Sequence, residues 1–182
     1  MVQCFNPPAC RRCVRLAGLL AAVLALAAFT ATSSLAAPER SSIVVDAASG
    51  TVIQANRPDK RHYPASLTKI MTLYMVFDAL ESGALRLDER LYVSPHAASM
   101  PPTELGLRAG DRITVETAIK ALVTESANDA AVVLAEHMAG TEWDFAMRMT
   151  RRARALGMQN TKFRNASGLP HPYQVTTARD MA

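Results

Sequence analysis

The chain has 182 residues, 20 of them basic and 16 acidic, which gives a net charge of +4 and a pI of about 9.2. Three of the basic residues, Arg11, Arg12 and Arg15, lie near the N-terminus, and without them 17 basic residues stand against 16 acidic ones. This near-neutral balance excludes the strongly basic surface of a nucleic-acid-binding protein, so no nucleic-acid partner is expected.

The N-terminal segment has the pattern of a secretory signal peptide over residues 1–36. The three arginines precede an apolar run at Leu16–Ala31, and Ser34–Ala36 supplies the small residues of a cleavage site. The run is short for a membrane span of about 20 residues, which argues against the alternative of a membrane anchor. We therefore expect export across the inner membrane to the periplasm or cell envelope, leaving one domain over residues 37–182.

The cysteines all lie inside this predicted signal peptide, at Cys4, Cys10 and Cys13. The remaining domain therefore has no thiol with which to form a disulfide. Its histidines have no spacing typical of a metal site and no cysteine partners. Neither a metal nor a cofactor is expected.

A β-hairpin is the first predicted element of the domain. Apolar and β-branched residues occupy Ser42–Asp46 and Thr51–Gln54, and the intervening residues Ala47–Gly50 favour a turn.

A helix with a serine at its start comes next. Pro64 suits a helix entry, and the apolar run Leu67–Phe77 continues the helical pattern to Gly83. Ser66 lies at the positive end of this helix, and Lys69, three residues later, shares its face. A serine needs a base to become a nucleophile, and an amine with an ordinary pKa of about 10.4 serves only when burial lowers that pKa. Because the run is apolar on nearly all sides, we expect a central, buried helix that desolvates Lys69.

A polar break between two helical patterns provides the next candidates. The pattern at Ala118–Val123 stops at the polar residues Thr124–Asp129, and helix resumes from Ala130 to Gly140. Polar side chains in an otherwise buried turn need partners, so Ser126 and Asn128 become candidate site residues. A Ser-x-x-Lys motif or a Ser-x-Asn motif alone also arises by chance. The residues Ser126–Asn128 are equally explained as a polar break between two helices.

The helical region as a whole runs from Pro64 through Leu156, with a proline-containing loop at Ser94–Gly110. At the end of the chain, Thr176–Ala182 has the pattern of a helix start with a threonine cap. A chain seldom stops within the first turn of a helix. We therefore expect the sequence to be either a fragment of a longer protein or the product of a prematurely stopped gene.

Together these stretches resemble the serine D-alanyl-D-alanine carboxypeptidases, which are low-molecular-mass penicillin-binding proteins. The resemblance extends from Ser42 to the last residue and implies an α/β fold of the penicillin-binding-protein/β-lactamase type. In that fold the N-terminal hairpin belongs to an antiparallel sheet beside the helical region, and the later strands of the sheet are missing from this sequence. The stretches that carry the resemblance are Pro64–Thr72, Gly110–Val115, Glu125–Ala131, Leu134–Gly140, Asn165–Pro172 and Thr177–Met181.

The resemblance implies a role for each candidate residue. Ser66 resembles the nucleophile that attacks the peptide bond between the terminal D-alanines of a peptidoglycan stem peptide, and Lys69 the base that takes its proton, a role disputed across the superfamily. Ser126 resembles the residue that relays a proton to the departing amine. Asn128 resembles the amide that orients the substrate and the lysine. The implied partners are stem peptides and β-lactams, and the resemblance is compatible with membrane association of a full-length protein.

One family motif is absent. A Lys-Thr-Gly strand motif would hold the substrate carboxylate and supply one oxyanion donor, and losing one such donor lowers the rate by a factor of about 10² to 10³. None of the four lysines, Lys60, Lys69, Lys120 and Lys162, begins this motif. Residues 37–182 are therefore interpreted as a partial catalytic domain, incomplete at its C-terminus, whose own activity is open.

Two alternatives to the carboxypeptidase assignment remain. The first is a non-catalytic periplasmic fragment that binds peptidoglycan or β-lactams without turnover. The second is a class A β-lactamase, which adds a loop glutamate to activate the deacylating water. The second is disfavoured because residues 157–182 contain no glutamate.

Overall fold

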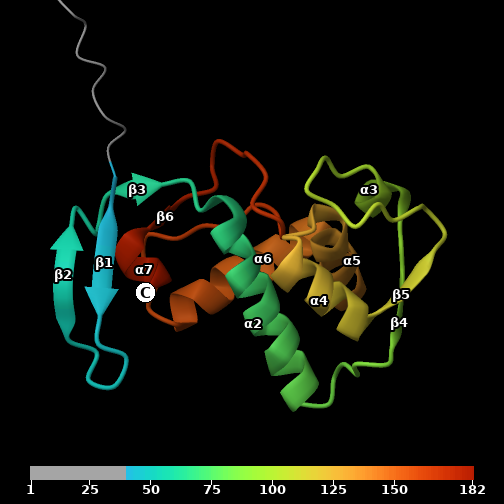
Figure 1. The fold of residues 1–182 in the computed structure, drawn as a ribbon, viewed down its shortest axis with the longest axis horizontal. Coiled ribbons are helices and arrows are strands. Elements are labelled where there is room, and N and C mark those ends of the chain that lie inside the picture. The colour runs from blue at the N-terminus through green and yellow to red at the C-terminus, as the bar shows by residue number, and fades with distance from the viewer. Residues whose placement is uncertain (1–39) are drawn as a thin grey trace, which may run out of the picture. The chain divides into compact units, whose positions relative to one another are not determined.

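The fold is shown in Figure 1, a computed structural model that describes residues 40–182. The predicted signal peptide lies outside the described residues. The remainder is a mixed α/β unit in which helices pack together beside short antiparallel strand pairs. The elements are β1 (Ser42–Val45), β2 (Val52–Asn56), β3 (Arg61–His62), a 3-10 turn (Ala65–Leu67), α2 (Thr68–Glu81), β4 (Arg90–Tyr92), α3 (Pro95–Ala98), β5 (Arg112–Thr114), α4 (Val115–Thr124), α5 (Asn128–Ala139), α6 (Glu142–Ala155), β6 (Thr176–Thr177) and α7 (Ala178–Met181).

The core is organised around α5. Every residue from Asn128 to Ala135 is buried, and α5 packs against α2, α3, α4, α6 and β4. Its many alanines let neighbouring helices approach closely, and larger side chains such as Phe145 from α6 and Leu91 from β4 fill the space between them. The helix ends where Gly140 adopts a φ of 84°, a conformation that glycine adopts without a steric penalty.

The prediction that α2 is central and buried on nearly all sides is wrong. One face is buried and contributes Met71 and Val76 to the core. The opposite face exposes Ile70, Tyr74 and Phe77, which are spaced one helical turn apart. Within residues 40–182, α2 packs against α4, α5 and α6, and the apolar residues on its other face remain exposed.

The N-terminal hairpin is confirmed. β1 and β2 pair antiparallel, with Ile43 opposite Ala55 and an irregularity between Val44 and Val45. In Figure 1 the pair lies at one side of the molecule with α7 beside β1. The hairpin forms a sheet of two strands and leaves Ile53 68% exposed, so it presents unpaired strand edges within the described residues.

Two further strand pairs are short and lie outside the predicted hairpin. β4 pairs with β5, which places Leu91 opposite Ile113 and buries Leu91 in the core. β3 pairs with β6, which brings the segment before Ser66 next to the segment before α7. Strands of two or three residues are too short to show an alternating pattern, so periodicity does not predict them.

The described part of the chain includes no helix with both the length and the apolar character needed to cross a lipid bilayer.

A matched pair of phenylalanines tests the position of the core. Phe145 is fully buried between the helices, whereas Phe77 on α2 is 51% exposed. We expect Phe145→Ala to lower the free energy of unfolding by about 3–5 kcal/mol, and Phe77→Ala by about 1 kcal/mol or less. Urea unfolding followed by circular dichroism measures both. Equal losses would contradict a core built around α5 and α6.

Candidate active site

Lys69 is the buried centre of the candidate site. It is the second residue of α2, is 4% exposed, and donates two hydrogen bonds from Nζ. One runs to Asn128 Oδ1 at 2.8 Å and the other to the Ser167 carbonyl at 2.7 Å. Burial lowers the pKa of Lys69 from 10.5 to about 8. The desolvation required for a lysine base is therefore present, and a substantial neutral fraction exists slightly above neutral pH.

Ser66 lies in the 3-10 turn that leads into α2, as the sequence predicted, and it is exposed. The residue before it, Ala65, has a φ of 47°, which is unusual for a residue with a side chain. Gly168 packs directly on the Ala65 carbonyl, and a Cβ at Gly168 would lie 1.9 Å from that oxygen. The backbone that presents Ser66 is thus held by a segment about one hundred residues further along the chain.

Asn128 and Ser126 lie at the junction of α4 and α5. Asn128 Nδ2 donates to the Pro101 carbonyl at 2.9 Å, so the amide joins Lys69 to the loop that covers this junction. Ser126 adopts a φ of 54°, and its carbonyl accepts a hydrogen bond from Thr103 Oγ1 at 3.1 Å. The structure brings Lys69 and Asn128 into direct contact. Among the described residues, the hydrogen bonds of Lys69 do not extend to Ser66 or Ser126.

The loop over this junction is held by Asp129, which sequence reasoning did not single out as functional. Asp129 is 1% exposed, and its carboxylate accepts backbone N–H groups from Leu105 at 3.0 Å and Leu107 at 3.1 Å. It also accepts the N–H of Ala130 at 2.7 Å. These donors replace the water that the carboxylate loses on burial.

The loop at residues 164–169 carries the second acceptor for Lys69 and is braced by polar side chains. Thr72 Oγ1 donates to the Ala166 carbonyl at 2.7 Å. Glu142 Oε1 accepts the N–H of Ala166 at 2.9 Å, and buried Gln174 accepts the N–H of Arg164 at 2.9 Å. Sequence reasoning missed these braces. A glutamate at a helix start is ordinary, and nothing local indicates that its carboxylate reaches this loop.

Two of the cavities in the described part of the chain concern the site. One, of about 420 Å³, is lined by Tyr63, Gly168, Pro170, His171 and Pro172, and Gly168 also packs on Ala65, the residue before Ser66.

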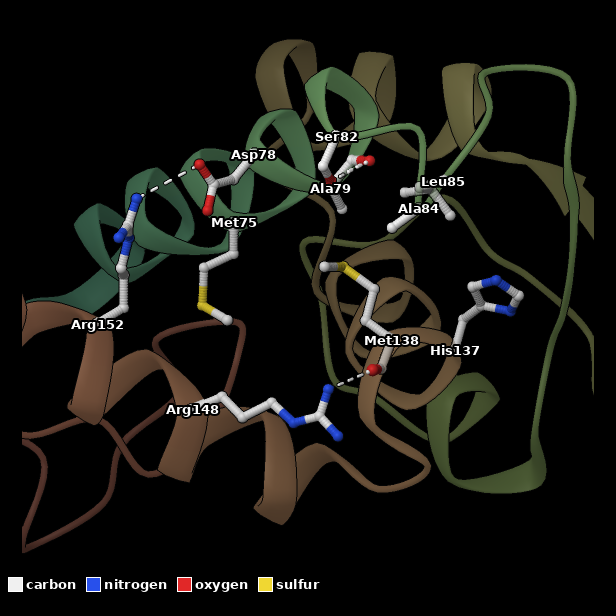
Figure 2. Close-up of a pocket in the computed structure, with 10 residues that line it drawn as sticks. All are labelled: Met75, Asp78, Ala79, Ser82, Ala84, Leu85, His137, Met138, Arg148 and Arg152. Atoms are coloured by element: carbon white, nitrogen blue, oxygen red, sulfur yellow. Dashed lines mark hydrogen bonds and ion pairs between the residues drawn. The ribbon is translucent and has the colours of Figure 1, made fainter.

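The other cavity, of about 390 Å³, lies at the far end of α2 and is shown in Figure 2. None of the four predicted residues lines it. Its arginines bind protein groups: Arg148 donates to the Met138 carbonyl, and Arg152 pairs with Asp78. Lys69 lies at the opposite end of α2, beside the turn that contains Ser66.

An exposed serine at the entry to a helix, followed one turn later by a buried lysine that is hydrogen-bonded to an asparagine of a second helix, matches the arrangement that the resemblance to penicillin-binding proteins implies. Comparison with known proteins identifies the family. Residues 28–182 match the family model described as D-alanyl-D-alanine carboxypeptidase. The chain belongs to this family.

Individual relatives agree with this assignment. The chain is 36% identical over 151 residues to D-alanyl-D-alanine carboxypeptidase DacF of Bacillus subtilis, covering 83% of this chain. The crystal structure of the carboxypeptidase DacD from Francisella tularensis superposes with a TM-score of 0.77 at 37% identity, over 80% of this chain and 35% of that one. Penicillin-binding protein D2 from Listeria monocytogenes in its ampicillin-bound form superposes with a TM-score of 0.63 at 31% identity, over 78% and 57% of the chains. The chain spans 39% of the length of the Bacillus relative.

The burial of Lys69 predicts a pH dependence of stability. Below pH 8 the folded and unfolded states are both protonated, and burial makes the charged form unfavourable only in the folded state. From pH 8 to 10.5 the folded protein loses the proton first, so its stability rises with pH. We expect the unfolding free energy of the wild type to gain about 3 kcal/mol over this range relative to Lys69→Met. Urea unfolding at a series of pH values measures the difference, and parallel curves would show that Lys69 is solvated.

The contact between Gly168 and Ala65 gives a second prediction. Gly168 and Gly140 have similar positive φ values, 90° and 84°, but a Cβ at Gly140 meets open space. Gly140→Ala therefore costs the conformational strain alone, about 1–2 kcal/mol. Gly168→Ala adds a collision with the Ala65 carbonyl and should lower the melting temperature clearly further. Similar melting temperatures for the two variants would mean that the loop at residues 164–169 does not press on the Ser66 backbone.

Proposed function

We propose that the protein is a serine D-alanyl-D-alanine carboxypeptidase, which removes the terminal D-alanine from peptidoglycan stem peptides through an acyl-serine intermediate at Ser66. The observation that carries the proposal is the buried Lys69, whose pKa is lowered to about 8 one helical turn after an exposed serine. An amine with this pKa is close enough to neutral pH to accept a serine proton. Membership of the family supplies the substrate class.

Each proposed site residue has one task. Lys69 takes the proton of Ser66 Oγ as that oxygen bonds to the carbonyl carbon between the two D-alanines. Ser126 passes a proton to the amine nitrogen, the carbon–nitrogen bond breaks, and free D-alanine departs. Water then hydrolyses the ester on Ser66. Asn128 orients the substrate and holds the Lys69 amine, as its 2.8 Å hydrogen bond allows.

The same chemistry accounts for acylation by β-lactams. Ser66 Oγ bonds to the lactam carbonyl carbon, the ring carbon–nitrogen bond breaks, and the ring nitrogen takes the proton. Because the nitrogen stays tethered, the whole drug remains on the serine. The similar Listeria structure, whose ampicillin-bound form was reported above, supports this expectation for the family.

The N-terminal pattern of arginines, apolar run and small residues supports action outside the inner membrane, in the periplasm or cell envelope. A second candidate is a non-catalytic protein that binds peptidoglycan or β-lactams without turnover.

Covalent labelling tests the proposal. The purified chain is incubated with benzylpenicillin and its intact mass is measured, with circular dichroism to show that each sample is folded. We expect one adduct of the mass of the drug on the wild type and none on Ser66→Ala. Ser82→Ala, which removes an exposed hydroxyl at the opposite end of α2, is the matched control and should keep the adduct.

The outcomes separate the two candidate functions. An adduct that persists in Ser66→Ala would overturn the assignment of the nucleophile. A folded wild type that forms no adduct but binds the drug reversibly, with unchanged affinity in Ser66→Ala, would favour the non-catalytic binding protein. Release of D-alanine from a peptide ending in D-alanyl-D-alanine, absent in Ser66→Ala, would show turnover as well as acylation.

A further inference from the structure

Glu142, the first residue of α6, bridges two segments beside the candidate site. Its side chain is 14% exposed, and both carboxylate oxygens have partners. Oε1 accepts the N–H of Ala166 at 2.9 Å, and Oε2 lies 3.0 Å from His96 Nε2 on α3. His96 is the titratable group that faces this carboxylate. The site assignments above give Glu142 no role.

The Ala166 contact matters because of the group that follows it in the chain. The Ala166 N–H is fixed by Glu142, the Ala166 carbonyl by Thr72, and the next carbonyl, that of Ser167, accepts from Lys69 Nζ at 2.7 Å. Three backbone groups of the adjacent residues Ala166 and Ser167 are thus held in fixed directions. A rotation about Ala166 would turn the Ser167 carbonyl away from the buried amine.

We propose that Glu142 is a positioning residue that holds the backbone at Ala166 so that the Ser167 carbonyl stays on the ammonium group of Lys69. Glu142 acts through the loop and does not touch the reacting atoms. The relevance of Glu142 to catalysis rests on the proposed function, because Glu142 acts on Lys69, the proposed base.

Helix capping alone does not explain Glu142. The N-cap of α6 is Thr141, whose hydroxyl accepts the N–H of Asp144, and Asp144 supplies a second acidic side chain in the first turn. An acidic residue at a helix start is stabilised whichever way its carboxylate points. The carboxylate of Glu142 instead extends from α6 to the Ala166 backbone and to α3, and this reach requires the full length of a glutamate.

The proposal has a measurable consequence at Lys69. Nζ is faced by Asn128 Oδ1 and the Ser167 carbonyl, and acceptors for the ammonium favour its charged form and oppose the effect of burial. Losing the Ser167 carbonyl should therefore lower the pKa of Lys69 further. A change that only loosened the protein and let water reach the amine would instead raise this pKa.

Two substitutions distinguish the effect of the length of the Glu142 side chain from the effect of its charge. Glu142→Gln keeps an oxygen that accepts the Ala166 N–H but removes the charge. Glu142→Asp keeps the charge at the helix start but is one methylene too short. The pKa of Lys69 is read directly by ¹³C NMR of lysine Cε in the full chain, with Lys69→Met identifying its signal among the four lysines. We expect a pKa about one unit below wild type in Glu142→Asp and a wild-type value in Glu142→Gln.

A third variant probes the same backbone from the other side. Thr72→Val keeps the shape of the buried side chain and removes the hydrogen bond to the Ala166 carbonyl, so the pKa of Lys69 should fall here too. It also keeps the proposal testable if Glu142→Asp does not fold. An unchanged pKa in a folded Glu142→Asp or Thr72→Val protein overturns the proposal. A fall in Glu142→Gln overturns it as well, because the charge alone would then act on Lys69 through space.

The same samples are treated with benzylpenicillin. If the wild type forms the adduct, the pH at which acylation becomes half-maximal should fall in Glu142→Asp and not in Glu142→Gln. If no protein forms an adduct, the proposed function fails, while the NMR result still decides the role of Glu142.

Discussion

The hydrogen bonds of Lys69 are the constraint on which the site depends. An ammonium group that is 4% exposed has lost most of its water and needs acceptors from the protein. Its acceptors lie 59 and 98 residues further along the chain, at Asn128 and Ser167. Burying Lys69 therefore requires α2, the start of α5 and the loop at residues 164–169 to meet. A fold that failed to join them would leave an unpaired charge in its interior, so the position of this amine and the packing of three segments depend on each other.

Polar side chains help to hold the two loops beside Lys69. Asp129 fixes the loop that includes Leu105 by accepting backbone N–H groups, and Glu142 does the same at Ala166. Each carboxylate is mostly buried and spans two segments. The apolar core around α5 sets where the helices lie, and these carboxylates then set the direction of individual peptide groups. Such directional control is what a site needs, because an acceptor that turns away no longer binds the amine.

Sequence patterns anticipated the elements whose signals are local. The hairpin, the helix entry that contains Ser66 and Lys69, and the helix start after Thr177 follow from turn residues, apolar periodicity and caps. The family resemblance implies one site for Lys69 and Asn128, and the structure has a hydrogen bond between them.

The remaining features have no local signal. β4 has three residues, too few for alternation to show, and the central place of α5 follows from how the helices assemble. The hydrogen bonds of Thr72 and Glu142 to the Ala166 backbone join side chains to a segment more than twenty residues away, and no spacing rule predicts such contacts.

The backbone conformations at the two candidate serines also depend on segments that are distant in the sequence. Ala65 and Ser126 hold left-handed conformations that cost about 1–2 kcal/mol each, and they persist only because neighbouring segments hold them. Gly168 presses on the Ala65 carbonyl, and Thr103 binds that of Ser126. A Ser-x-x-Lys motif in an isolated helix would have the same residues but not the left-handed backbone conformation at the residue before the serine. The loops that hold this conformation are therefore as much a part of the site as the motif is.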